Sequence, residues 1–203
     1  MKIKLIEAAA FTAFIIAVIL SVADFEGDCK NIRQEVLRLH VIANSDSYED
    51  QLLKLKVRDN VLEKGKSIFG ISDNKNDAKK ALEINQKLIE SVAEEEIRKN
   101  GYDYPVKVEI GKSRFPTKTY GNITLPAGEY DALRVIIGEG SGKNWWCVMF
   151  PPMCLPAASE DVKIDDVMNE KELQLVESSP KYEVRFWIIE KIESIKQKMA
   201  EKS

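Results

Sequence analysis

The alternation of apolar and polar positions first predicts a strand followed by a helix. Apolar residues occupy every second position from Leu37 to Ala43, and the turn residues Asn44-Ser45-Asp46-Ser47 end this run. Such alternation is typical of a strand. From Tyr48 to about Lys66 the spacing becomes helical, and the residues expected to face inward are Leu52, Leu53, Leu55, Val57, Val61 and Leu62. Asp50 lies three residues after Ser47, which fits a capping pair at the start of this helix.

A second helix and several strands are predicted in the middle of the chain. The pattern from about Asp77 to Lys99 favours one amphipathic helix that stops before Gly101. Strands are indicated for the segments Val106 to Ile110, Leu133 to Ile137 and Trp145 to Phe150. The connections rich in Gly and Pro are a turn at Leu125-Pro126-Ala127-Gly128 and a flexible hairpin connection at Gly138-Glu139-Gly140-Ser141-Gly142.

Helical spacing returns near the C-terminus. Apolar residues follow the order i, i+4, i+7, i+11 at Ile188, Ile192, Ile195 and Met199, which predicts a terminal helix. A short strand near Tyr182 to Phe186 is a further expectation. These elements together predict an α+β fold: an N-terminal signal or anchor helix, then one domain with a small, mostly antiparallel sheet and two or three packed helices.

The N-terminal segment has the pattern of an export signal. Lys2 and Lys4 precede an uncharged run from Ala8 to Ala23, and the small residues at its end favour cleavage after Ala23. The run of about 16 residues is roughly 24 Å long as a helix, against a hydrocarbon core of roughly 30 Å, so an uncleaved membrane anchor is the alternative. We assign residues 1–23 to this signal peptide or anchor, with membrane contact if it is uncleaved, and residues 24–203 to a single domain.

The net charge and the histidine content limit the partners and the kinds of site that the chain can have. The formal net charge of −3 leaves no basic excess to bind a phosphate backbone, so nucleic acid is not an expected partner. His40 is the only histidine. A two-histidine metal site therefore cannot be built, and we expect no metal and no cofactor. The favoured interpretation makes His40 a hydrogen-bonded structural residue, Asp46 a helix cap and Asp59 a helix ion-pair partner, and predicts that the chain is not an enzyme. An extracytoplasmic hydrolase using His40 and Asp46 is the alternative.

The cysteines and tryptophans cluster in one stretch. Trp145 and Trp146 should point to opposite faces of a strand, which would place one in the core and leave the other available to a partner. Cys147 and Cys154 are close in sequence, and Pro151 and Pro152 lie between them. This spacing does not fit a redox motif, so we predict a structural disulfide between the two. Cys29 follows Glu26-Gly27-Asp28, which excludes a lipidation motif, and remains unpaired.

Two long blocks of the sequence resemble a known family. The first runs from Leu37-Arg38-Leu39-His40 through Asn44-Ser45-Asp46-Ser47 to Val57-Arg58-Asp59, and the second runs from Leu125-Pro126-Ala127-Gly128-Glu129-Tyr130 through Asn144-Trp145-Trp146-Cys147 to Cys154. In these blocks, from about residue 30 to about residue 155, the chain resembles the stage II sporulation protein R family of endospore-forming bacteria. The C-terminal third departs from that resemblance.

The resemblance implies a secreted messenger. Members of the family are made in the forespore, cross its membrane into the septal space between two membranes, and are sensed by a membrane-embedded aspartic protease of the mother cell, which then processes a sigma factor precursor. We expect this protease to be the partner. The residues predicted to contact it come from the first strand and the turn after it, from the following helix and from the aromatic stretch: His40, Asn44, Asp46, Arg58, Trp145 and Trp146.

Overall fold

The computed structural model describes residues 2–69, 72, 74–121, 123–151, 168, 172, 175–176 and 183–200. Its elements in chain order are α1 (Lys2–Glu35), β1 (Leu37–Ile42), α2 (Tyr48–Phe69), α3 (Lys75–Ile84), α4 (Gln86–Lys99), β2 (Val106–Phe115), β3 (Lys118–Tyr120), β4 (Ile123–Leu125), β5 (Gly128–Ile137), β6 (Asn144–Phe150) and α7 (Glu183–Ala200). The predicted α+β class, with a mostly antiparallel sheet, is confirmed.

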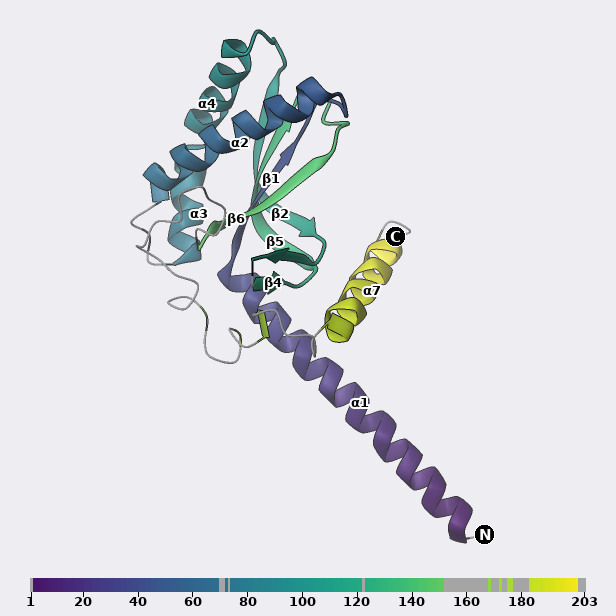
Figure 1. The fold of residues 1–203 in the computed structure, drawn as a ribbon. Coiled ribbons are helices and arrows are strands. Elements are labelled where there is room, and N and C mark those ends of the chain that lie inside the picture. The colour runs from purple at the N-terminus through teal and green to yellow at the C-terminus, as the bar shows by residue number, and fades with distance from the viewer. Residues whose placement is uncertain are drawn as a thin grey trace.

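The main sheet has β1 at its centre (Figure 1). Its strand order is β2-β5-β1-β6, with β1 parallel to β5 and antiparallel to β6, while β3 and β4 form a separate two-stranded ribbon. The predicted hairpin at residues 138–142 is therefore wrong, because β1 lies between the two strands that this segment joins. Every residue of β1 is buried, as expected for a strand with a neighbour on each side. Because β1 lies between β5 and β6, residues 138–142 cross over its end instead of forming a tight turn.

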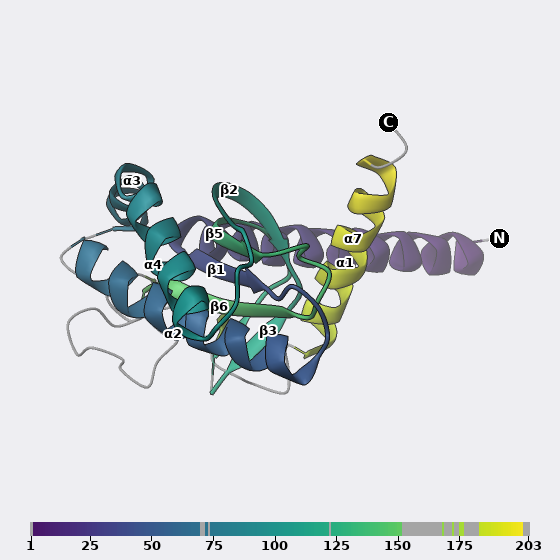
Figure 2. The ribbon, with the colours of Figure 1, turned by 90° about the horizontal axis from the view of Figure 1, so that it is seen from above.

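The sheet separates two hydrophobic cores. Helices α2, α3 and α4 cover one face, where Leu39 and Val41 of β1 pack with Leu53 and Val57 of α2. The other face packs against the end of α1, the β3–β4 ribbon and α7. Figure 2 shows the three central helices on one side of the strands, with α1 and α7 extending from the other. The buried apolar residues of α2 and α4 thus all belong to the first of these two cores.

The single helix predicted from Asp77 to Lys99 is interrupted at Asn85. The side-chain amide of Asn85 donates to the Ala81 carbonyl at 2.8 Å, and its backbone N–H donates to Ala81 and Leu82. Asparagine competes with the helical backbone for hydrogen bonds in this way, which ends α3 and lets α4 begin in a new direction. At the other end, the Asn74 side chain caps α3 by accepting from the Asp77 N–H at 3.0 Å.

Helix α1 continues through the predicted cleavage point at Ala23 and ends inside the domain. Its last turns contribute Phe25, Cys29 and Ile32 to the second core, and Cys29 is a free, buried thiol. The segment Ala9–Glu35 of α1 is long and apolar enough to cross a membrane by length and composition, with a mean hydropathy of 1.9. An N-terminal helix of this kind fits a signal or an anchor, and the domain boundary after Ala23 stays a prediction.

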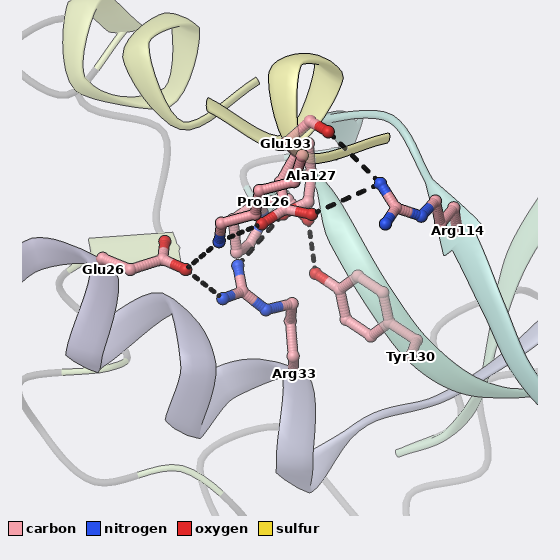
Figure 3. A network of polar contacts seen from close by, with 8 residues as sticks. Glu26, Arg33, Arg114, Pro126, Ala127, Tyr130 and Glu193 are labelled. Atoms are coloured by element: carbon pink, nitrogen blue, oxygen red, sulfur yellow. Dashed lines mark hydrogen bonds and ion pairs between the residues drawn. The ribbon is translucent and has the colours of Figure 1, made fainter. Parts of the chain in front are cut away.

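The predicted turn at residues 125–128 receives the side chain of Arg33 from α1 (Figure 3). Arg33 donates to the Ala127 carbonyl at 3.0 Å and to the Glu26 carboxylate at 2.8 Å, while the Tyr130 hydroxyl donates to the Pro126 carbonyl. Gly128 has a φ of +146°, and a Cβ built there would lie 2.6 Å from Arg33 Cδ. Glycine is needed here because α1 approaches this turn so closely.

The C-terminal helix is confirmed as α7, but the short strand expected before it is wrong. Residues 183–186 belong to the helix, and Tyr182 lies outside the described residues. The apolar stripe of this helix lies only partly on the core, which Ile192 contacts. Ile195 is 58% exposed and Met199 is 68% exposed, whereas Phe186 and Ile189 are buried.

Candidate functional site

The two distinctive sequence blocks meet where β1 pairs with β6. In this antiparallel pairing, Trp146 lies opposite His40, and Trp145 lies opposite Val41. Because neighbouring residues of a strand point to opposite faces, the two tryptophans separate as predicted. Trp145 is on the face covered by α2, where Val41 is also buried, and Trp146 packs against the core on the side of α1.

Trp145 is held at the surface by an arginine from α2. The guanidinium carbon of Arg58 lies 4.4 Å from the centroid of the Trp145 ring, and Arg58 also forms an ion pair with Asp59 at 2.6 Å. The predicted ion-pair role of Asp59 is confirmed. A cation over an indole face is an attractive contact, so Trp145 is restrained while 37% of it remains exposed. The structure thus brings together two of the predicted contact residues, Arg58 and Trp145.

Two further exposed side chains come from the outer face of α2. Tyr48 and Leu52 are both exposed and lie one helical turn apart. The prediction that Leu52 faces inward is wrong, because the buried face of this helix carries Leu53 and Val57. Sequence reasoning missed Tyr48 and Leu52 as surface residues. The signal was their four-residue spacing, which places both opposite the buried face. We call Tyr48, Leu52, Arg58 and Trp145 the α2–β6 surface.

His40 lies on the opposite face of the sheet and is almost fully enclosed. Its Nε2 atom hydrogen-bonds with Asn144 Oδ1 at 2.7 Å, and its ring stacks on Trp146 with the centroids 6.0 Å apart. Burial lowers the pKa of His40 below its usual value, the charges of Arg134 and Arg38 add to this, and the hydrogen bond with Asn144 opposes it. His40 is therefore an uncharged imidazole at neutral pH, with the hydrogen bond expected of a structural histidine.

Arg38 is a further buried charge beside His40, and sequence reasoning gave it no role. Its Nε atom donates to the Cys147 carbonyl at 3.0 Å, and Nη2 donates to the Tyr120 hydroxyl at 2.6 Å. The guanidinium carbon also lies 4.2 Å from the centroid of Phe115. The sequence feature that could have identified it is an arginine within a mostly apolar strand. The side chain of Arg38 thus connects β1 to β6 and to the β3–β4 ribbon, next to Trp146.

Asn44 and Asp46 hold the connection between β5 and β6 in place. The Asn44 side chain donates to Asp50 at 2.9 Å and accepts from the Glu139 N–H at 3.1 Å. Asp46 accepts from the Lys143 N–H at 2.7 Å. The expectation that Asp46 caps the helix is wrong, because the cap of α2 is Ser47, whose hydroxyl accepts from the Asp50 N–H at 3.2 Å. These contacts set where β6 begins and so position Trp145.

The contact role predicted for His40, Asn44, Asp46 and Trp146 stays a prediction. Each of these residues has a structural role in the fold, and only Trp145 and Arg58 are combined on an exposed face. Cys147 is buried in β6, and Cys154 lies outside the described residues, so the disulfide between them also stays a prediction.

In the described part of the chain, His40 and Asp46, the two residues that the hydrolase alternative uses, each have a different hydrogen-bond partner. Asp46 accepts a hydrogen bond from the backbone of Lys143, and His40 Nε2 bonds to the amide oxygen of Asn144, which is neither a carboxylate nor a nucleophile. Within the described residues, no group of three or more histidine, cysteine, aspartate or glutamate side chains is arranged to hold a metal ion.

Comparison with known proteins places the same region in a family. The family described as stage II sporulation protein R matches residues 33–160, which is more than half of the chain. Stage II sporulation protein R of Bacillus subtilis (strain 168) is 39% identical over 123 residues, covering 61% of this chain and 55% of that protein. The chain thus spans about half the length of this curated relative. No solved structure matches the chain. The match includes β1, β6 and the α2–β6 surface, and the chain therefore belongs to the stage II sporulation protein R family.

Proposed function

We propose that this protein is an exported signalling protein of sporulation, which triggers a membrane-embedded aspartic protease of the mother cell to process a sigma factor precursor. The protein acts by contact and has no catalytic step of its own. Family membership supports the sporulation role, and the apolar helix α1 supports passage into, or anchoring at, a membrane that faces the septal space.

The observation that carries the contact role is the exposed Trp145 held by Arg58. Large aromatic side chains at surfaces are frequent centres of binding energy, and a restrained ring loses less conformational entropy when a partner covers it. The cation at 4.4 Å from the ring supplies that restraint. Tyr48 and Leu52 are further exposed side chains of α2. The α2–β6 surface is therefore our proposed contact with the protease.

The internal hydrogen bonds around this surface suit a recognition role. Asn44 and Asp46 join the loop after β1 to the loop before β6, so α2 and β6 keep a fixed relation. A preorganised surface of this kind binds without first paying for ordering of its loops. Side chains beneath the surface then determine its shape, although they need not touch the partner.

Reconstitution tests the proposal. The purified membrane protease and its precursor substrate are combined in vesicles with and without the full chain, and precursor processing is followed by gel electrophoresis. We expect processing only when the chain is present. The chain alone should leave cell-wall fragments and peptides intact, because the hydrolase alternative predicts turnover without the protease. Processing at the same rate without the chain would contradict the proposal.

A further inference from the structure

Helix α7 is attached to the rest of the protein along two of its sides. On one side, Arg114 at the end of β2 donates to the Glu193 carbonyl at 3.2 Å, and the Glu193 carboxylate lies 3.8 Å from the same guanidinium (Figure 3). On the other side, the rings of Phe25 and Phe186 meet edge to face at 5.5 Å. Lys196 reaches the Glu26 carboxylate of α1 at 3.5 Å.

A third side of α7 carries an apolar stripe, and the fold covers only its first half, where Ile192 packs against the second core. The stripe with the spacing i, i+4, i+7, i+11 consists of Ile188, Ile192, Ile195 and Met199. Its last two members are 58% and 68% exposed. Trp187, on the flank of this stripe, is also 58% exposed, and the ammonium nitrogen of Lys191 lies 5.6 Å from its ring centroid. A helix with an apolar stripe flanked by tryptophan and lysine is typical of a membrane surface.

The position of α7 along α1 identifies what covers this stripe. Ile188 and Ile189 line a small pocket with Ser21, Val22 and Phe25, so α7 crosses α1 where the apolar segment of α1 ends. Before that point, the side chains of α1 project into the surroundings, and Phe11, Phe14 and Leu20 are all exposed. Figure 1 shows α1 leaving the domain as a long rod, with α7 beside the point of departure.

A lipid bilayer would cover both the exposed side chains of α1 and the exposed part of the α7 stripe. A bilayer around the first part of α1 has its headgroup layer near Ser21 to Glu26, which is the level at which α7 makes its contacts. Tryptophan and lysine concentrate at that depth in membrane proteins. A second copy of the chain would cover the stripe of α7 but would leave the preceding turns of α1 without an apolar environment.

We propose that α1 is retained as a membrane anchor and that α7 is an interfacial helix on the outer surface of the same membrane. The exposed end of its stripe, Ile195 and Met199, faces the acyl chains, and Trp187 and Lys191 lie among the headgroups. The ion pairs of Glu26 with Arg33 and Lys196 and the contact of Arg114 with Glu193 then fix the domain above this plane. This inference does not use the proposed protease contact, which is on the opposite face of the sheet.

Depth-dependent fluorescence quenching tests the position of α7. The full chain is reconstituted in vesicles of phosphatidylcholine and phosphatidylglycerol, with and without phosphatidylcholine brominated at acyl carbons close to the headgroup. Trp187 is isolated as the difference between the wild-type protein and Trp187→Phe. We expect the bromine to quench the wild-type emission more strongly than that of Trp187→Phe, and we expect this difference to be lost in the double variant Ile195→Asp, Met199→Asp.

Ile84→Asp serves as the control, because Ile84 is an even more exposed apolar residue and belongs to a different helix, α3. This control should keep the full quenching difference, and circular dichroism should show the same helix content in all variants. Equal quenching of the wild-type protein and Trp187→Phe would overturn the proposal. Detection of a cross-linked dimer through α7 together with unquenched Trp187 would overturn it in favour of a second copy.

Discussion

The guanidinium carbon of Arg58 lies 4.4 Å from the centroid of the Trp145 ring, and this contact links helix α2 to the edge strand β6. These residues are far apart in the sequence and meet because β6 pairs with β1, directly beside α2. The contact restrains an aromatic side chain at an exposed position without burying it. An aromatic ring that is both restrained and exposed is the physical basis for our proposal that the α2–β6 surface contacts the protease.

Arg58→Ala should release Trp145 while leaving the fold intact. An exposed cation–π contact contributes about 0.5 to 1 kcal/mol, so the free energy of unfolding should fall by no more than ~1 kcal/mol. Trp145 should become more exposed, and its fluorescence emission should shift to longer wavelength. Arg98→Ala is the control, because Arg98 is a helical arginine of α4 with an ion pair to Glu94 at 3.5 Å. An identical emission spectrum for Arg58→Ala would contradict the contact.

Asp131 should be a principal determinant of stability. This buried carboxylate forms ion pairs with Lys75 at 2.6 Å and Lys79 at 2.9 Å. Asp131→Asn would leave the buried ammonium of Lys75 without its counter-charge, which costs about 3 to 5 kcal/mol. Denaturation by urea measures this loss. Glu94→Gln, which removes an exposed carboxylate of α4, should change stability by less than ~0.5 kcal/mol.

Acid should remove the same contribution in the wild-type protein. Burial alone raises the pKa of Asp131, but the hydrogen bonds from Lys75 and Lys79 outweigh it and hold this pKa well below the ordinary 3.8. The contribution is therefore complete above pH 3.8 and is lost as the pH falls from 3.8 towards the folded-state pKa. The wild-type protein should lose more stability in this range than Asp131→Asn, and parallel curves would contradict the assignment.

His40 should make stability depend on pH in a second range. Its pKa in the folded protein is lowered from 6.5, mainly by burial, so the unfolded chain binds a proton first as the pH falls. The contribution of the neutral imidazole is complete above pH 6.5 and is lost as the pH falls below that value. His40→Gln should lack this dependence in thermal denaturation from about pH 7 to about pH 5. An unchanged pH dependence of stability in His40→Gln would contradict the assignment.

Gly142 should tolerate no side chain, because it lies against the loop after β1. A Cβ at this position would lie 2.2 Å from the backbone oxygen of Ser45, whereas a Cβ at Gly111 of β2 would have no neighbour within 4 Å. Gly142→Ala should therefore lower the free energy of unfolding by about 1 to 3 kcal/mol, as overpacking does. Gly111→Ala should have little effect, and equal stability of the two variants would show that the loop adjusts freely.

The sequence predicted the local elements well, because strand alternation and helical spacing are local signals. It placed β1 correctly between Leu37 and Ile42, and it separated the faces of Trp145 and Trp146. Prediction from the sequence failed where residues far apart in the chain determine the structure. The hairpin expected at residues 138–142 is absent because β1, from much earlier in the chain, occupies the neighbouring position in the sheet.

The candidate site was predicted only in part for the same reason. Asp46 has the sequence position of a helix cap, yet its carboxylate binds the backbone of Lys143, a residue that only the folded sheet brings close. The stripe from Ile188 to Met199 has the spacing of a core helix, but periodicity does not reveal which apolar medium covers it. Arg38 is similar, since its burial depends on aromatic residues from β2 and β3.

The most direct test of the contact mechanism compares two variants of the full chain in the reconstituted protease assay. Trp145→Ala removes the exposed ring of the α2–β6 surface, and Ile84→Ala removes an exposed apolar side chain of α3. With both variants folded by circular dichroism, we expect precursor processing to be lost with Trp145→Ala and unchanged with Ile84→Ala. Full processing with Trp145→Ala at limiting concentrations of the chain would contradict the account.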